Sequence, residues 1–179
     1  MPGILADLVR REKVQSVVLG ASWVGYVGTE LLVEREGMRL LLNTTEGKAA
    51  FYANLQDYVR LLQSQGAKVY LVFGVPIDLD RFNPGKMVTR GLTLRISPDV
   101  EKPVLNSQLR AGTAFGDANL RTVAEQTGAT LLDPFPDVCG NGEGCSPFFG
   151  SAEPKFSDGM HLRPIFVREH LRFLDPLLK

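Results

Sequence analysis

A short apolar run at residues 69–73 constrains the fold most, because residues that end regular structure flank it on both sides. Gly66 precedes the run, and Gly74 and Pro76 follow it. An uninterrupted series of Val, Tyr, Leu and Phe of this length is typical of a parallel strand that is covered on both faces. The sequence therefore predicts a central strand here, with helices packed against it.

The segment before this strand predicts a long amphipathic helix. Asn43 is suited to cap the helix, and Glu46 follows three positions later, as in a capping box. The next residues place one apolar stripe at helical spacing: Ala49, Tyr52, Leu55, Tyr58, Val59 and Leu62. Gly66 is expected to end the helix, which then leads into the central strand.

A helix and a strand are also expected at the N-terminal end. Residues 4–13 place apolar side chains at helical spacing, and residues 14–19 predict a short buried strand that ends at Gly20. Residues 21–26 are then expected to form the loop at the carboxyl end of that strand. This is the edge at which open α/β sheets bind ligands.

The alternation of helix and strand repeats toward the C-terminus. Residues 111–126 predict a second long helix, with Leu120, Val123 and Ala124 on its inward face, and residues 129–132 predict another short strand. Strands that alternate with helices favour an α/β architecture. We expect three layers, α/β/α, with a mainly parallel sheet.

The remaining stretches have weaker patterns. Residues 28–42 stay unassigned, since the apolar run within them fits a strand or a helix. Residues 77–103 are rich in Pro, Gly, Asp and Arg, and their length favours a functional or covering loop over a simple connection. Residues 135–155 also predict a loop. A closing helix with Pro164 in its first turn is expected to bury Phe166, Leu171, Leu174 and Leu178.

Composition narrows the class of protein. The 179 residues, 44% of them hydrophobic, suit a single domain over residues 1–179 with a buried core. Twenty acidic side chains balance twenty basic ones, so no net field favours nucleic acid or an anionic membrane surface. The chain as given has no apolar run of about eighteen residues and no signal-peptide pattern. We therefore expect no nucleic-acid partner and no export signal within it.

The two cysteines, Cys139 and Cys145, lie in the sequence CGNGEGC. This glycine-rich loop is flexible enough to close a small disulfide ring, and a pair of free thiols is the alternative that composition leaves open. A zinc site requires about four ligands, and one histidine is near in sequence, so we expect no metal.

Asp158 and His161 carry the strongest chemical signal, within the sequence FSDGMHL at residues 156–162. A carboxylate beside a histidine fixes the tautomer of the imidazole and stabilises the imidazolium once it accepts a proton. Such a pair needs a nucleophile as its third member. The spacing by itself also fits the capped start of a helix with an exposed histidine.

Three features together resemble a known family. The first strand leads into Ala21-Ser22-Trp23, Asp133 precedes the close cysteine pair, and FSDGMHL follows. This combination resembles the SGNH (GDSL-type) hydrolases, and more narrowly the SGNH domain attached to membrane acyltransferases of the acyltransferase 3 family. The resemblance runs from about residue 4 to the end of the chain and corresponds to the latter two-thirds of the family's usual fold.

The resemblance implies a role for each candidate residue. Asp158 would orient His161, His161 would act as the base, Trp23 would bind substrate near the oxyanion hole, and Cys139 and Cys145 would form a disulfide. It implies acyl-ester chemistry on acetyl or other short-chain esters of cell-surface glycans, outside the cytoplasmic membrane and without a metal or organic cofactor. It also implies a membrane acyltransferase domain as a partner in a longer chain.

The nucleophile is the open question. The family begins with a strand that leads to Gly-Asp-Ser, and this motif does not occur in the 179 residues. We favour the hypothesis that the nucleophile lies outside this chain, because a helix precedes the first predicted strand. In the alternative, Ser22 is the nucleophile. A third hypothesis is a non-catalytic module that binds a glycan or a partner and in which Asp158 and His161 are relics.

Overall fold

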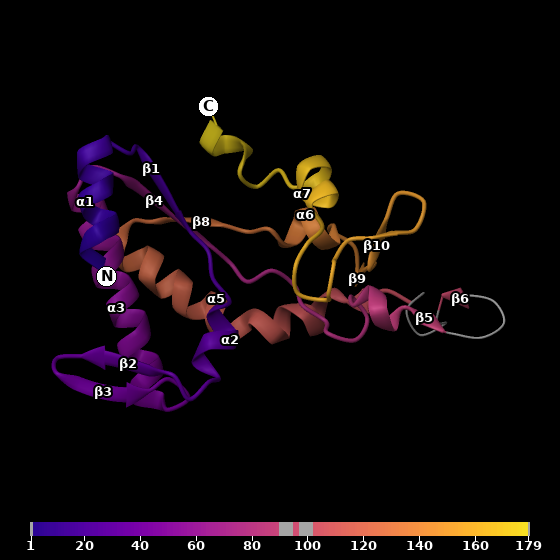
Figure 1. Ribbon diagram of the computed structural model, residues 1–179, viewed down its shortest axis with the longest axis horizontal. Coiled ribbons are helices and arrows are strands. Elements are labelled where there is room, and N and C mark those ends of the chain that lie inside the picture. The colour runs from indigo at the N-terminus through magenta and orange to yellow at the C-terminus, as the bar shows by residue number, and fades with distance from the viewer. Residues whose placement is uncertain (1, 90–94, 97–101, 179) are drawn as a thin grey trace. The chain divides into compact units, whose positions relative to one another are not determined.

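The computed structural model describes residues 2–89, 95–96 and 102–178 (Figure 1). The chain divides into two compact units. Unit 1 comprises Met1–Gly74 and Phe115–Asp133, and unit 2 comprises Val75–Ala114 and Pro134–Lys179. The single domain expected over residues 1–179 stays a prediction.

Unit 1 is built on a parallel sheet of three strands in the order β1-β4-β8. Its strands are β1 (Ser16–Leu19), β4 (Lys68–Val72) and β8 (Thr130–Leu132). In the register of the sheet, Leu71 of β4 lies opposite Leu19 of β1 and Leu131 of β8. The run at residues 69–73 therefore forms the central parallel strand, as predicted.

The long helices that accompany this sheet are α1 (Pro2–Glu12), α3 (Thr45–Ser64) and α5 (Asn106–Thr127), the last of which begins in unit 2. The predicted cap of α3 is wrong, since Thr44 and not Asn43 is the N-cap, and its hydroxyl accepts a hydrogen bond from Gly47 N at 3.0 Å. The stripe is also shifted at its start, where Ala50 is buried and Ala49 is exposed.

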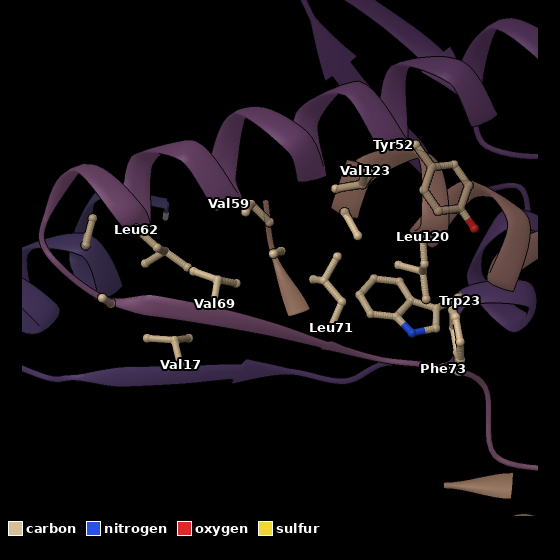
Figure 2. Close-up of a cluster of buried hydrophobic side chains, with 14 of the residues drawn as sticks. Val17, Trp23, Tyr52, Val59, Leu62, Val69, Leu71, Phe73, Leu120 and Val123 are labelled. Atoms are coloured by element: carbon tan, nitrogen blue, oxygen red, sulfur yellow. The ribbon is translucent and has the colours of Figure 1, made fainter. Parts of the chain in front are cut away.

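Apolar side chains from the helices and the sheet form the core of unit 1. Figure 2 shows Val59 and Leu62 of α3 pointing toward Val69 and Leu71 of β4. Val59, Leu62 and Leu71 are fully buried. Burial of each such side chain contributes about 1.5–3 kcal/mol, so this periodic packing holds the unit together.

Residues 28–42, which had no clear pattern, form a β-hairpin of β2 (Leu32–Arg35) and β3 (Met38–Leu41). Glu36 and Gly37 occupy the turn with φ angles of 53° and 78°, as a two-residue hairpin turn requires. The hairpin packs on α3, where Arg35 Nη1 donates to Asn54 Oδ1 at 2.8 Å and to Asp57 Oδ2 at 2.9 Å. A hairpin packed on one face would show an alternating pattern, but apolar residues at exposed positions, namely Leu32, Met38 and Leu41, hide it in this sequence.

The stretch after β1 also differs from the prediction. Residues 21–26 were expected to be loop, but Trp23–Val27 form a short helix, α2. Trp23 and Val27 are buried on one side of it. Burial of these two apolar side chains explains why the chain turns into a helix directly after the sheet edge.

Unit 2 has short elements joined by loops. Besides the start of α5, they are η1 (Pro84–Lys86), β5 (Val88–Thr89), β6 (Arg95–Ile96), β7 (Val104–Leu105), α6 (Phe135–Cys139), β9 (Gly144–Cys145), β10 (Phe148–Phe149), β11 (Glu153–Pro154), α7 (Pro164–His170) and η2 (Asp175–Leu178). The expected loop at residues 77–103 lies partly outside the described residues. The expected loop at residues 135–155 is wrong in detail, since it contains α6 and three short strands.

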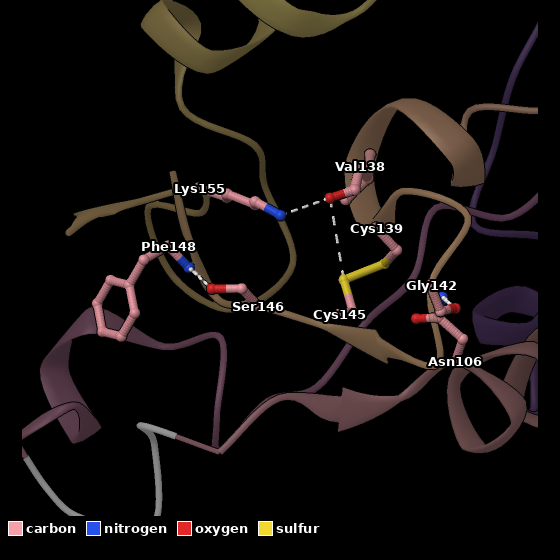
Figure 3. Close-up of a disulfide and its surroundings, with 8 residues drawn as sticks. All are labelled: Asn106, Val138, Cys139, Gly142, Cys145, Ser146, Phe148 and Lys155. Carbon is pink, nitrogen blue, oxygen red and sulfur yellow. Dashed lines mark hydrogen bonds between the residues drawn. A yellow bond between two sulfur atoms is a disulfide. The ribbon is translucent and has the colours of Figure 1, made fainter. Parts of the chain in front are cut away.

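The two cysteines are joined in a disulfide, as the resemblance implied (Figure 3). Cys139 ends α6, and Cys145 lies in β9, which pairs with β7. Beside the ring, the Lys155 ammonium donates to the carbonyl oxygen of Val138 at 2.6 Å. Lys155 is 8% exposed, and burial lowers the pKa of its amine. The disulfide and Lys155 thus tie the loop to α6.

The predicted closing helix is too long. Helix α7 ends at His170, where Leu171 takes an extended conformation. Asp137 Oδ2 then accepts from the backbone N–H groups of Arg172 and Phe173, at 2.6 and 2.7 Å. Because this carboxylate uses the N–H groups that would continue the helix, the chain leaves the helical path there. Phe166 is buried as expected, but Leu174 is 39% exposed.

Candidate functional site

Asp158 and His161 lie on a closed turn of unit 2. Phe156 and Leu162 form an antiparallel bridge at its base. Within the turn, Ser157 donates twice to the carbonyl oxygen of His161, from its backbone N at 2.8 Å and from Oγ at 3.0 Å. Since Phe156 is fully buried, the turn is anchored to the core of unit 2 on its N-terminal side.

The Asp158 carboxylate organises the turn. Its Oδ1 accepts from the backbone N of Met160 at 3.0 Å and from the backbone N of His161 at 2.9 Å. Between them, Gly159 has a φ of 85°, a conformation that residues with a side chain rarely adopt. The spacing of Asp158 and His161 thus reflects an aspartate-capped turn, in which the glycine supplies the left-handed position.

The other carboxylate oxygen faces the imidazole. Asp158 Oδ2 lies 2.8 Å from His161 Nδ1. The hydrogen bond from the His161 side chain, followed by those from the backbone N–H groups of His161 and Met160, lowers the pKa of Asp158 to about 2. An ionised carboxylate only accepts, so Nδ1 carries the proton and Nε2 is left to accept one. This is the geometry of an orienter and a base.

The pair is open to solvent. The side chain of His161 is 73% exposed and that of Asp158 is 54% exposed. General-base catalysis of acyl transfer gains from a site that excludes water and holds the reactants. The pair alone does not provide such enclosure, and its role as orienter and base stays a prediction.

Ser22 and Trp23 belong to unit 1, at the carboxyl end of β1. Ser22 is exposed and precedes α2, and its side chain makes no capping hydrogen bond. Gly25 lies against the Ser22 hydroxyl, where a side chain would collide with Oγ. The structure thus brings Asp158 and His161 together within unit 2 and holds Ser22 in unit 1, and its role as nucleophile stays a prediction.

Trp23 is a core residue of unit 1. The residue is 5% exposed, and its Nε1 donates to the carbonyl oxygen of Val72, the last residue of β4, at 2.7 Å. This hydrogen bond satisfies the indole N–H and fixes the carboxyl end of the central strand. A role in substrate binding stays a prediction, and so buried a ring offers little surface for contact.

Sequence reasoning missed Asp117, a buried carboxylate at the same sheet edge. Asp117 is 7% exposed, and its Oδ1 accepts from the backbone N of Gly74, just after β4, at 3.1 Å. Burial, and then the charge of Asp117, raises the pKa of Tyr52 to about 12. A signal was present, because Asp117 lies one helical turn before Leu120 on the inward face of α5.

The described residues contain no group of three or more His, Cys, Asp or Glu side chains that could hold a metal ion. The expectation that the chain uses neither a metal nor an organic cofactor stays a prediction.

The parallel sheet and its helices define an α/β protein, and the turn pairs the Asp158 carboxylate with the His161 imidazole. The family model described as "SGNH domain (fused to AT3 domains)" matches residues 3–172. The chain therefore belongs to this family, as the motifs predicted. Among the curated proteins compared, none matches it.

A solved structure also resembles this chain. The periplasmic domain of the lipopolysaccharide acetyltransferase of Salmonella ser. Paratyphi A superposes with a TM-score of 0.58 at 12% identity, over 99% of this chain and 62% of that one. At this identity, the likeness supports the α/β fold and carries no residue roles. The chain corresponds to less than two-thirds of that structure.

Proposed function

We propose that this chain is the SGNH module of an acyl-transfer protein, in which Asp158 orients His161 and His161 is the base for a serine nucleophile. The acyl group is acetyl or another short chain, and the acceptor is a hydroxyl of a cell-surface glycan. One observation carries the proposal. A single carboxylate folds the turn through Oδ1 and presents Oδ2 to His161 Nδ1 at 2.8 Å.

The reaction proceeds in two steps. The serine Oγ attacks the carbonyl carbon of the acyl ester while His161 Nε2 takes the hydroxyl proton, and this proton passes to the departing alkoxide. The acceptor hydroxyl, or water in a hydrolase, then attacks the acyl-serine and gives its proton to His161. His161 returns a proton to the serine as the product leaves. Asp158 stabilises the imidazolium in both steps.

We place the nucleophile on a segment outside these 179 residues, with Ser22 as the alternative. In the described part of the chain, β1 pairs with β4 on one side and with no strand on the other. An unpaired parallel edge is open to a further strand. The alternative, in which Ser22 is the nucleophile, is supported by the exposure of Ser22 and by its position directly after β1.

We further propose that the module works outside the cytoplasmic membrane, next to a membrane acyltransferase domain. The family description names such a fusion, and the solved neighbour is a periplasmic domain. The disulfide between Cys139 and Cys145 fits an oxidising compartment. Across the described residues, no helix has both the length and the apolar character needed to cross a bilayer.

The second candidate function is a non-catalytic module that binds a glycan or a partner. The 73% exposure of the His161 side chain favours it, because an exposed imidazole lacks the enclosure of a working active site.

An esterase assay with a short-chain aryl acetate tests these proposals. The parent chain is compared with Ser22→Ala, His161→Ala and Ser151→Ala, the last as a control at an exposed serine of unit 2 outside the turn. If Ser22 is the nucleophile, Ser22→Ala and His161→Ala each abolish turnover and Ser151→Ala retains it.

An inactive parent chain would exclude Ser22 as a self-sufficient nucleophile. The same His161→Ala change is then made in the longer natural protein that contains the chain. Glycan acetylation that survives this change would contradict the catalytic proposal and favour the binding module.

A further inference from the structure

The turn that carries Asp158 and His161 rests on a second segment of unit 2, residues 78–83, which we call the support segment. A methyl group placed on Gly159 would lie 3.2 Å from the carbonyl oxygen of Asp78. It would also lie 3.3 Å from Leu79 Cα and from Asn83 Cβ. The backbone of the turn is therefore in direct contact with the support segment, without room for a side chain between them.

An aspartate folds the support segment in the same way as Asp158 folds the turn. Asp78 Oδ1 accepts from the backbone N of Asp80 at 3.0 Å and from the backbone N of Arg81 at 2.8 Å. The Asp78 carbonyl oxygen accepts from Phe82 N at 2.9 Å. Two aspartate-capped turns thus lie against each other, and Gly159 is the point of contact.

A stacked pair of aromatic rings holds the two turns against each other. Phe82 at the end of the support segment stacks on Phe156, with ring centroids 4.7 Å apart and planes 10° from parallel. Both rings are fully buried. Because Asp158 follows Phe156 by two residues, the position of its backbone depends on the rings and on the Gly159 contact.

Because the side chains of Asp158 and His161 are exposed, their placement depends on the contact between the turn and the support segment. With the side chains of His161 and Asp158 largely in solvent, little packing restrains the imidazole itself. From these contacts we propose that Asp78 is a positioning residue for the Asp158–His161 pair. Its carboxylate shapes the support segment, and the segment holds the turn in the conformation in which Oδ2 meets Nδ1. The importance of Asp78 for acyl transfer rests on the proposed function, but its role in holding the turn does not.

The test compares Asp78→Ala with Asp78→Asn in the full chain. The asparagine side-chain oxygen can accept the same two backbone hydrogen bonds, whereas alanine offers no acceptor. Asp80→Ala is the matched control, since it removes a carboxylate that pairs with the Lys86 side chain on the same loop. The readout is NMR titration of the Asp158 carboxyl carbon, together with the ring-nitrogen shifts of His161.

In Asp78→Ala, the pKa of Asp158 is expected to rise from about 2 toward its ordinary value of 3.8 as the hydrogen bonds to its carboxylate loosen. The His161 Nδ1–H signal is expected to lose its hydrogen-bonded shift. Asp78→Asn and Asp80→Ala are expected to keep the parent values. A folded Asp78→Ala chain with an unchanged Asp158 titration would overturn the proposal, as would equal shifts in the alanine and asparagine variants.

If Asp78→Ala does not fold, Asp78→Ser provides the same test, because its shorter hydroxyl is a weaker acceptor. It is expected to give an intermediate shift, and the absence of any shift would overturn the proposal. The NMR readout is independent of turnover. A shifted titration would support Asp78 as a positioning residue whether or not the chain is active, and the proposed function would still be tested by His161→Ala in the longer natural protein. Glycan acetylation that survives His161→Ala there, beside a shifted titration here, would reject the proposed function and keep the positioning role.

Discussion

The two units of this protein are stabilised in different ways. In unit 1, regular elements pack through one apolar cluster, and Leu62 and Leu71 are fully buried within it. Unit 2 has an apolar cluster of its own, which includes Phe82, Phe156 and Phe166. In addition, the disulfide, the Lys155 ammonium and the aspartate-capped turns tie its short segments together. The comparison teaches that long regular elements let unit 1 rest on apolar packing, whereas the short segments of unit 2 need covalent and polar links as well.

The largest expected effect is in the core of unit 1. Leu71→Ala is expected to lower the free energy of unfolding by about 2–5 kcal/mol, because it removes a buried side chain from the central strand and leaves a cavity. Val18→Ala is the control, since Val18 is 41% exposed in β1, and its cost is expected to stay below about 1 kcal/mol. Urea unfolding measures both, and similar losses in the two variants would contradict the account of this core.

Removal of the disulfide is the matching test of unit 2. Replacement of Cys139 and Cys145 by serine is expected to cost about 2 kcal/mol, from the chain entropy that a short ring removes from the unfolded state. Hydrogen exchange should show faster opening of amides in unit 2, with unit 1 unaffected. Equal loss of protection in both units would break the distinction between them.

A smaller effect is expected at Tyr52 in unit 1. Its buried hydroxyl makes no hydrogen bond within the described residues, so Tyr52→Phe is expected to be neutral or stabilising by up to about 1 kcal/mol at pH 7. The pKa of Tyr52 is raised from 10.0 to about 12. The folded state therefore keeps a proton that the unfolded chain loses, and stability falls as the pH rises through this range.

Alkaline unfolding of Tyr52→Phe checks this linkage. The variant is expected to lose less stability than the parent between pH 10 and about 12. Tyr58→Phe serves as the control at a less buried tyrosine on the same helix, and an equal effect of both changes would contradict the role of burial.

The smallest expected effect is on the exposed Asp158. Its pKa in the folded chain, about 2, is below the ordinary 3.8, so its contribution to stability is present above pH 4 and is lost as the pH falls toward 2. His161→Ala is expected to raise the Asp158 pKa only part of the way, because two backbone N–H groups still bind Oδ1. Carboxyl-carbon NMR measures this. A return to the full 3.8 would show that the imidazole alone sets the pKa.

The sequence predicted unit 1 better than unit 2, for a physical reason. The central strand and the long helices bury side chains at regular intervals, so the periodicity at Val59 and Leu62 indicates their packing directly. The hairpin was missed because Leu32, Met38 and Leu41 are apolar and yet exposed, which hides the alternation of its short strands. The α3 cap was misassigned because Asn43 and Thr44 are both good capping residues, and the backbone conformation decides between them.

The candidate site, too, could be predicted only in part from the sequence. The FSDGMHL motif located Asp158 and His161 because both partners lie on one short turn. The support segment had no signal, since its contact with Gly159 joins residues far apart in the chain. The extent of α7 was overestimated because its hydrophobic pattern continued beyond His170, where Asp137 takes the backbone N–H groups.

Lys155 has a consequence for chemical labelling. An acylating reagent reacts with an amine that is unprotonated and exposed to solvent. The Lys155 amine is buried and hydrogen-bonded to the carbonyl oxygen of Val138, so it should react slowly. The Lys86 side chain is 55% exposed and should react promptly. Since Lys155 lies three residues before Asp158, its slow modification would record how often this segment opens. The rate at which Lys155 is modified therefore reports local unfolding of the segment that leads into the turn of Asp158 and His161.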